Sequence, residues 1–206
     1  MKHVEARRRD RRRRPVRGQR SLRPAPSIRW GLADVGVGYV AAVALSLMRG
    51  SRDAVGEFGI SVVWSDVPVG IAVGCAAQLL VVPAVPWPLQ RILGGDVSAS
   101  ARELLGPAGA GRWVLGAAVI TGAPLAEELF FRGLLLRSLT RHMTDVAAIG
   151  VSAVLFAATH LQLLPFPGLF ASGVVFAVLV RRTGRLGPAI FAHAAFNATT
   201  VVALLI

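Results

Sequence analysis

The chain has 206 residues, of which 54% are hydrophobic and 17% are charged. Soluble domains carry roughly 25% charged residues, so this composition argues against an ordinary soluble domain. A spanning helix needs roughly 20 apolar residues, and the length therefore limits the chain to about seven spans. The net charge of +12 is mostly local, because 12 of the 23 Lys and Arg residues lie between Met1 and Arg29.

Residues 1–29 form the first predicted region, a basic arm that is too polar to bury a core and should be disordered. Such an arm can bind nucleic acid. We favour a cytoplasmic anchor that fixes topology by the positive-inside rule and contacts anionic lipid, because the arm runs directly into a hydrophobic segment. The sequence therefore predicts a multi-pass protein of the cell membrane with its N-terminus in the cytoplasm.

The rest of the chain predicts an all-α, polytopic bundle of about six spans, because long apolar segments in lipid must be helical. Residues 30–112 should hold two transmembrane helices and an interfacial linker with a short amphipathic helix. Residues 113–206 should form a core of about four helices. The predicted spans are Trp30–Met48, Val67–Leu89, Trp113–Leu136, Val146–Leu161, Pro165–Val180 and Pro188–Ile206.

The third predicted span contains three ionisable residues, Glu127, Glu128 and Arg132. Each costs roughly 2.5–3.5 kcal/mol at the centre of a spanning helix before any pairing. Glu128 and Arg132 are four residues apart and can pair on one helical face. Glu127 lies about 100° around the same helix and lacks a partner in its own span. A purely structural role in helix packing accounts for the pair but leaves Glu127 unexplained.

Two later spans each contain a histidine. Phe156 and His160 are four residues apart, so the aromatic ring and the imidazole share a face. His193 and Asn197 have the same spacing and place an imidazole and an amide on one face. A lone histidine in an apolar helix is usually a packing residue, but the joint occurrence of these groups favours a shared site.

These residue types suit hydrolysis of an amide bond. A Glu can act as general base toward water while a His orients the water or moves the proton. An Asn and a second His can donate to the oxyanion of a tetrahedral intermediate. Alternatively, Glu127, His160 and His193 are a plausible ligand set for a divalent metal such as zinc. HExxH and GxSxG are both absent, which argues against the ordinary zinc-protease and serine-hydrolase arrangements.

The motifs Glu127-Glu128-x-x-x-Arg132, Phe156-x-x-x-His160 and His193-x-x-x-Asn197, in this order, resemble those of the CPBP family. This family comprises CAAX prenyl proteases and bacteriocin-processing or self-immunity membrane proteins, often labelled Abi. The resemblance covers about Trp113–Ile206. Each motif alone is weak, but the ordered set is specific.

The resemblance implies an intramembrane endopeptidase, metal- or glutamate-dependent, that cleaves a peptide or protein substrate at the membrane. Glu127 and His160 would then activate water, and His193 and Asn197 would complete the site or stabilise the oxyanion. Glu128 and Arg132 would be a structural pair, and Phe156 would line the site. We expect the four catalytic candidates to meet around one water molecule.

The alternative is a non-catalytic scaffold or bacteriocin self-immunity protein that uses the same cluster for packing or partner binding. A transporter is a weaker third interpretation.

Overall fold

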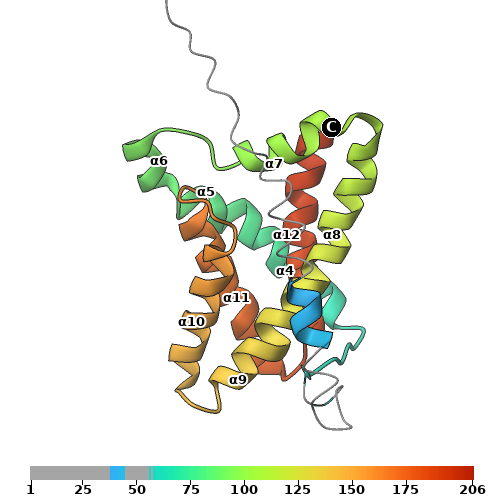
Figure 1. The fold of residues 1–206 in the computed structure, drawn as a ribbon, viewed down its shortest axis with the longest axis vertical. Helices are drawn as coiled ribbons and strands as arrows, with labels where there is room; N and C mark the ends of the chain where they lie inside the picture. The colour runs from blue at the N-terminus through green and yellow to red at the C-terminus, as the bar shows by residue number, and fades with distance from the viewer. Residues whose placement is uncertain (1–37, 45–55, 57) are drawn as a thin grey trace, which may run out of the picture.

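The computed structural model describes residues 38–44, 56 and 58–206, and all regular structure within these ranges is helical (Figure 1). The helices are residues 38–44, α4 (Asp66–Ala76), α5 (Val82–Ala84), α6 (Trp87–Leu93), α7 (Ala99–Leu105), α8 (Arg112–Glu128), α9 (Arg137–Leu139), α10 (Asp145–Ala158), α11 (Phe166–Thr183) and α12 (Gly187–Leu205). The prediction of an all-α fold is thereby confirmed.

Irregular turns connect several of these helices into longer rods. A π-helical segment, Ala77–Val81, joins α4 to α5, and a second, Leu129–Leu136, joins α8 to α9. A 3₁₀ segment, Gly106–Gly111, connects α7 to α8. The predicted linker between the second and third spans thus contains the short helix α7.

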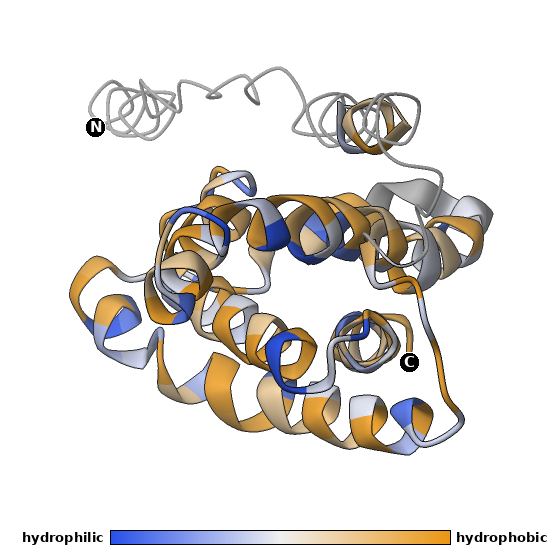
Figure 2. Cartoon of the chain, turned by 90° about the horizontal axis from the view of Figure 1, so that it is seen from below, coloured by the Kyte–Doolittle hydropathy of each residue, from blue (hydrophilic) through white to orange (hydrophobic). Residues whose placement is uncertain are grey.

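Four helical stretches of the described ranges are long and apolar enough to cross a membrane: Asp66–Leu93, Arg112–Leu139, Phe166–Thr183 and Gly187–Leu205. Hydrophobic colouring dominates along these helices in Figure 2. α10 is also apolar but has only 14 residues, so it is shorter than the predicted span that ended at Leu161. Most of the first predicted span lies outside the described residues, and its residues 38–44 are helical.

Local capping sets the ends of α10 and α11. The Thr144 hydroxyl accepts a hydrogen bond from the Ala147 amide at 3.4 Å, and Asp145 follows in the first turn, where an acid favours the helix dipole. α11 ends at Gly184, whose φ of 71° is a left-handed conformation that glycine adopts without steric penalty. These caps fix where α10 begins and where α11 turns back into α12.

α4 and α12 form the most closely packed helix pair in the described part of the chain. A Cβ atom on Gly74 would collide with the backbone carbonyl of Ala192, and one on Gly70 would lie 2.9 Å from the Pro188 carbonyl oxygen. Small residues are what allow two spanning helices to approach this closely. We call this contact the α4–α12 seam, and it holds α12, which carries His193, against the N-terminal part of the described chain.

Several arginines gather at the end of the bundle where α9 lies in Figure 1. Arg181 pairs with Asp145 at 2.7 Å, and Arg185 pairs with Asp66 at 2.7 Å. Arg137 donates to the Gly184 carbonyl oxygen at 2.6 Å. We call this group of five charged residues the arginine-rich end, and it joins the first residue of α4 to the α11–α12 turn.

Candidate active site

The acidic motif lies where α8 changes into the π-helical segment. Glu127 and Glu128 are the last two residues of α8, and Arg132 falls within Leu129–Leu136. Pro124 lies inside α8, one turn before Glu128, and cannot donate its backbone nitrogen to the helix. π-helical turns inside α-helices are rare and are frequent at functional sites. The sequence thus places its ionisable residues at a local break in regular helix geometry.

Arg132 and Glu128 are both completely buried. Arg132 Nη1 donates to Glu128 Oε1 at 2.9 Å, as their spacing predicted, and Nη2 donates to the Gly173 carbonyl oxygen of α11 at 3.1 Å. The guanidinium also lies over the Phe156 ring, 4.5 Å from its centroid. Because a buried charge is costly unless it is paired, these contacts fix α8, α10 and α11 relative to one another.

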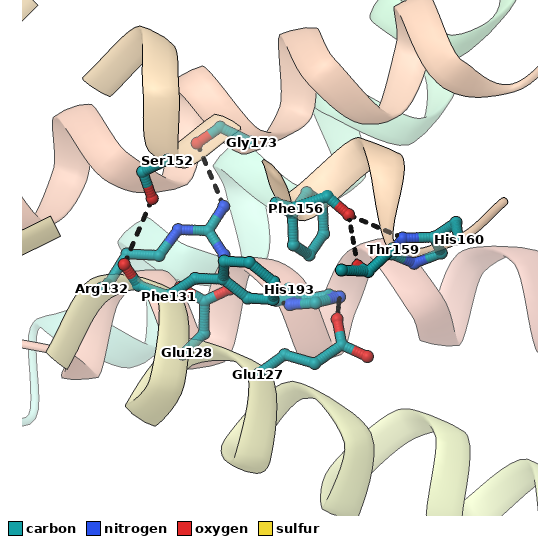
Figure 3. A network of polar contacts seen from close by, with 10 residues as sticks. All are labelled: Glu127, Glu128, Phe131, Arg132, Ser152, Phe156, Thr159, His160, Gly173 and His193. Atoms are coloured by element: carbon teal, nitrogen blue, oxygen red, sulfur yellow. Dashed lines mark hydrogen bonds and ion pairs between the residues drawn. The ribbon is translucent and has the colours of Figure 1, made fainter. Parts of the chain in front are cut away.

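Glu128 has a second partner that its position in the sequence does not reveal. His193 Nδ1 lies 2.9 Å from Glu128 Oε1, the same oxygen that accepts from Arg132, and Figure 3 draws these three residues together with Glu127 on the other side of the ring. Arginine remains protonated in proteins, so Glu128 serves as an ionised acceptor and Nδ1 carries the imidazole proton. Nε2, on the other side of the ring, faces Glu127.

Aromatic rings hold His193 in this orientation. The imidazole is stacked on Phe176, with centroids 5.1 Å apart and an interplanar angle of 24°, and meets Phe156 edge-on at 5.6 Å. His193 is 3% exposed, so the ring has little freedom to rotate away from Glu128. This arrangement, a carboxylate that fixes the tautomer of an imidazole, is the one that orients histidines in many hydrolytic sites.

Glu127 lies beside His193 on the side of the ring that faces away from Glu128. Glu127 Oε2 lies 3.8 Å from His193 Nε2, which is too long for a direct hydrogen bond. This oxygen is buried and has no hydrogen-bond partner in the described part of the chain. A buried carboxylate oxygen without a partner is energetically unfavourable. It is therefore a strong acceptor for a proton donor that enters the site.

His160 lies just beyond the last residue of α10. Its Nδ1 is 2.9 Å from the Phe156 carbonyl oxygen, and the Thr159 hydroxyl donates to the same oxygen at 2.8 Å. A carbonyl can only accept, so Nδ1 of the neutral imidazole must carry the proton and Nε2 must be free. Both histidines therefore present the same nitrogen as a potential base.

The turn after His160 is strained. Leu161 has a φ of 54°, in the left-handed region, which costs roughly 1–2 kcal/mol for a residue with a side chain. Its side chain is 87% exposed, so its own packing does not compensate for that cost.

The structure thus brings most of the predicted residues into one cluster. Phe156 links the histidines, since its ring lies 5.1 Å from His160 and 5.6 Å from His193. Asn197, one turn beyond His193 on α12, instead donates its amide to the Val119 carbonyl oxygen of α8 at 2.8 Å. Sequence reasoning missed Gly173 and Phe176, because neither a backbone acceptor nor one Phe among nine gives a signal in the sequence.

The predicted metal set does not fit this arrangement. Among the residues that the structure describes, no group of three or more His, Cys, Asp or Glu side chains is placed to hold a metal ion.

Comparison with known proteins supports the motif-based resemblance. Residues 109–199 match a family model described as type II CAAX prenyl endopeptidase Rce1-like. This range includes all of the predicted site residues, from Glu127 to Asn197, and the predicted resemblance to the CPBP family is confirmed over it. No match was found among curated proteins or among solved structures. With the four apolar helices, the family match indicates a multi-pass membrane protein.

Proposed function

We propose that this protein, whose residues 109–199 match the Rce1-like family, is an intramembrane endopeptidase with Glu127 as its general base. The observation that carries the proposal is the buried, unpartnered Oε2 of Glu127 beside His193 Nε2. Glu128 Oε2 is also buried without a partner, but the other oxygen of Glu128 is held by Arg132 and His193, each at 2.9 Å, whereas the contact of Glu127 with His193 Nε2 is 3.8 Å long. A hydrolytic role requires an oxygen that is free to take a proton from water.

The proposed reaction is a general-base hydrolysis. Glu127 takes one proton from a water molecule, and the resulting hydroxide attacks the carbonyl carbon of the scissile peptide bond. The tetrahedral intermediate collapses when Glu127 returns the proton to the amide nitrogen, which leaves as an amine while the carbonyl carbon becomes a carboxylic acid. His160 assists by accepting a hydrogen bond from the water at its free Nε2.

His193 has a distinct role in this proposal. Its Nδ1 proton is held by Glu128, so its Nε2 can donate to an oxyanion only while it holds the proton that Glu127, 3.8 Å away, has taken from water. Glu127 takes this proton back before it passes it to the leaving amine. The neighbouring carboxylates of Glu127 and Glu128 would both stabilise the resulting imidazolium. Asn197 would have to release Val119 before its amide could reach an oxyanion, so we assign it a smaller role than His193.

Replacement of Glu127 tests the function directly. Glu127→Gln removes the base but keeps the shape of the side chain, and we expect activity to fall by about 10²–10⁴-fold, the range of general-base catalysis. The assay uses purified full-length protein in liposomes and fluorogenic peptides that end in CAAX, with and without a prenyl group on the cysteine. A peptide without CAAX completes the set and reports on substrate class.

The matched control is Glu103→Gln, an exposed acid on α7 outside the site, which should leave activity unchanged. The Glu127→Gln protein should also unfold at the wild-type temperature, because its acid makes no hydrogen bond through Oε2. Full activity of the Glu127→Gln variant would favour the scaffold or immunity-protein alternative.

A further inference from the structure

Two further arginines, Arg141 and Arg182, lie beside the arginine-rich end. Arg141 is in the turn between α9 and the start of α10, and Arg182 follows Arg181 in the last turn of α11. Both are exposed, and in the described part of the chain neither side chain makes a hydrogen bond, an ion pair or a contact with an aromatic ring. Arg137 donates to the Gly184 carbonyl oxygen, which carries no charge. Three of the described arginines here therefore lack a carboxylate partner.

The opposite end of the bundle, formed by α6, α7 and the start of α8, uses its arginines differently (Figure 1). Each of its three arginines has a partner within the protein, and the pairs are Arg102 with Asp96, Arg91 with the Trp87 ring and Arg112 with the Trp113 ring. Among the described residues, its net charge is +1, from three arginines, Asp96 and Glu103. Five arginines and two carboxylates give the arginine-rich side a net charge of +3 with histidine neutral.

The arginine-rich end lies where the spanning helices meet the membrane surface. All four of the long apolar stretches have one end here, at Asp66, Leu139, Thr183 and Gly187. Figure 2 looks onto this end of the bundle. Trp64, two residues before Asp66, is 85% exposed, and exposed tryptophans are typical of the level of the lipid headgroups. Headgroups therefore surround this end when the protein is in a membrane.

We propose that the arginine-rich end, together with Arg141 and Arg182, is a surface that binds anionic phospholipid headgroups. A guanidinium can donate two hydrogen bonds to one phosphate, and each arginine near an anionic membrane surface strengthens binding by about fivefold. A zwitterionic headgroup has the same phosphate but adds a positive charge that offsets this attraction. The inference does not depend on the proposed proteolysis, and it concerns residues other than the predicted basic arm of residues 1–29.

The test reads the lipid beside Arg141. In the full-length chain, the four native tryptophans are replaced by Phe, and Met143→Trp places one fluorophore at an exposed position in the same turn. The protein is reconstituted in mixtures of phosphatidylglycerol and phosphatidylcholine, with bromine on the acyl chains of either lipid. Bromine quenches tryptophan only at short range, so the two series give the relative binding constant of the two lipids at this surface. We expect a preference for phosphatidylglycerol.

The variants separate this surface from the overall charge of the protein. Arg141→Gln with Arg182→Gln should lower the relative binding constant by about fivefold for each arginine removed. Arg141→Lys with Arg182→Lys keeps both charges and should retain the preference. The matched control, Arg91→Gln with Arg112→Gln, removes two arginines from the opposite end and should leave the preference unchanged.

Three outcomes would overturn the proposal. The first is an unchanged preference in the Arg141→Gln, Arg182→Gln variant, and the second is an equal fall in the matched control. The third is loss of the preference in inorganic phosphate at an ionic strength at which chloride leaves it intact, because the surface would then bind free phosphate. The double variant should melt at the wild-type temperature, since neither side chain has a partner in the described chain. If it fails to fold, each single variant provides the same test with a fivefold effect.

Discussion

The middle of the bundle and its arginine-rich end both contain arginine–carboxylate pairs. These pairs differ in how far they are buried and therefore in how much the protein loses in stability when one partner is removed. Arg132 and Glu128 are completely buried, whereas the side chains of Arg181 and Asp145 are 36% and 56% exposed. Arg185 and Asp66 are intermediate, with exposures of 31% and 2%. Water can replace a lost partner at the exposed pair but not at the buried one, so burial decides what each pair contributes.

The buried pair should show the largest effect on stability. Glu128→Gln leaves the Arg132 charge without a counter-ion in an apolar interior, and we expect a loss of about 3–5 kcal/mol in the free energy of unfolding. Unfolding in mixed detergent, followed by tryptophan fluorescence, measures this change.

A double variant sharpens this prediction. Glu128→Leu with Arg132→Met removes both charges, and we expect most of the stability to return, because apolar replacement of a buried pair is often neutral. Proteolytic activity should be lost in the double variant even when its stability returns, because His193 Nδ1 no longer has a carboxylate partner. A double variant that remained as unstable as Glu128→Gln would show that the pair does more than satisfy two charges.

The Asp66–Arg185 pair should show a smaller effect. Asp66 accepts a hydrogen bond from Arg185 at 2.7 Å and one from the Val63 amide at 2.9 Å. Asp66→Asn therefore weakens the contact between α4 and the α11–α12 turn. Arg185 can turn toward water because it is partly exposed. We expect the melting temperature in detergent to fall by about 3 °C, a shift typical of roughly 1 kcal/mol in a chain of this size. A fall as large as that of Glu128→Gln would contradict the ranking by burial.

The exposed pair should matter least. Asp145→Asn removes an ion pair of a kind that contributes about 0.2–1 kcal/mol, and it leaves the Thr144 cap of α10 in place. The melting temperature should change by less than about 3 °C, and added salt should reduce the difference between variant and wild type. A salt-independent effect would show that Asp145 does not act through its charge pair with Arg181.

The sequence predicted helices and contacts between neighbouring residues better than contacts between residues that are far apart in the chain. The i,i+4 spacing of Glu128 and Arg132 predicted their contact, and hydropathy located the segments that became α4, α8, α11 and α12. These features follow from helical periodicity and apolar content alone. The roles assigned to the site residues remain predictions.

Contacts between remote parts of the chain could not be predicted in the same way. The bond between Glu128 and His193 joins residues 65 positions apart, and it depends on how α12 packs against α8. Tyr39 gave no signal because its ring contacts with Phe130 and Phe131 exist only after two helices have docked. The early end of α10 at Ala158 was missed because no Gly or Pro follows it within the predicted span, and the chain turns instead at Leu161.

The α4–α12 seam also closes the space between these two helices to other molecules. Gly74 meets the Ala192 backbone so closely that a single methyl group has no room between the two helices, and a lipid chain or an extended peptide has still less. Ala192 precedes His193, so one flank of the candidate site is closed to the bilayer. Under the proposed function, a substrate that diffuses laterally in the membrane must therefore approach Glu127 along another side of α12, unless α4 and α12 first move apart.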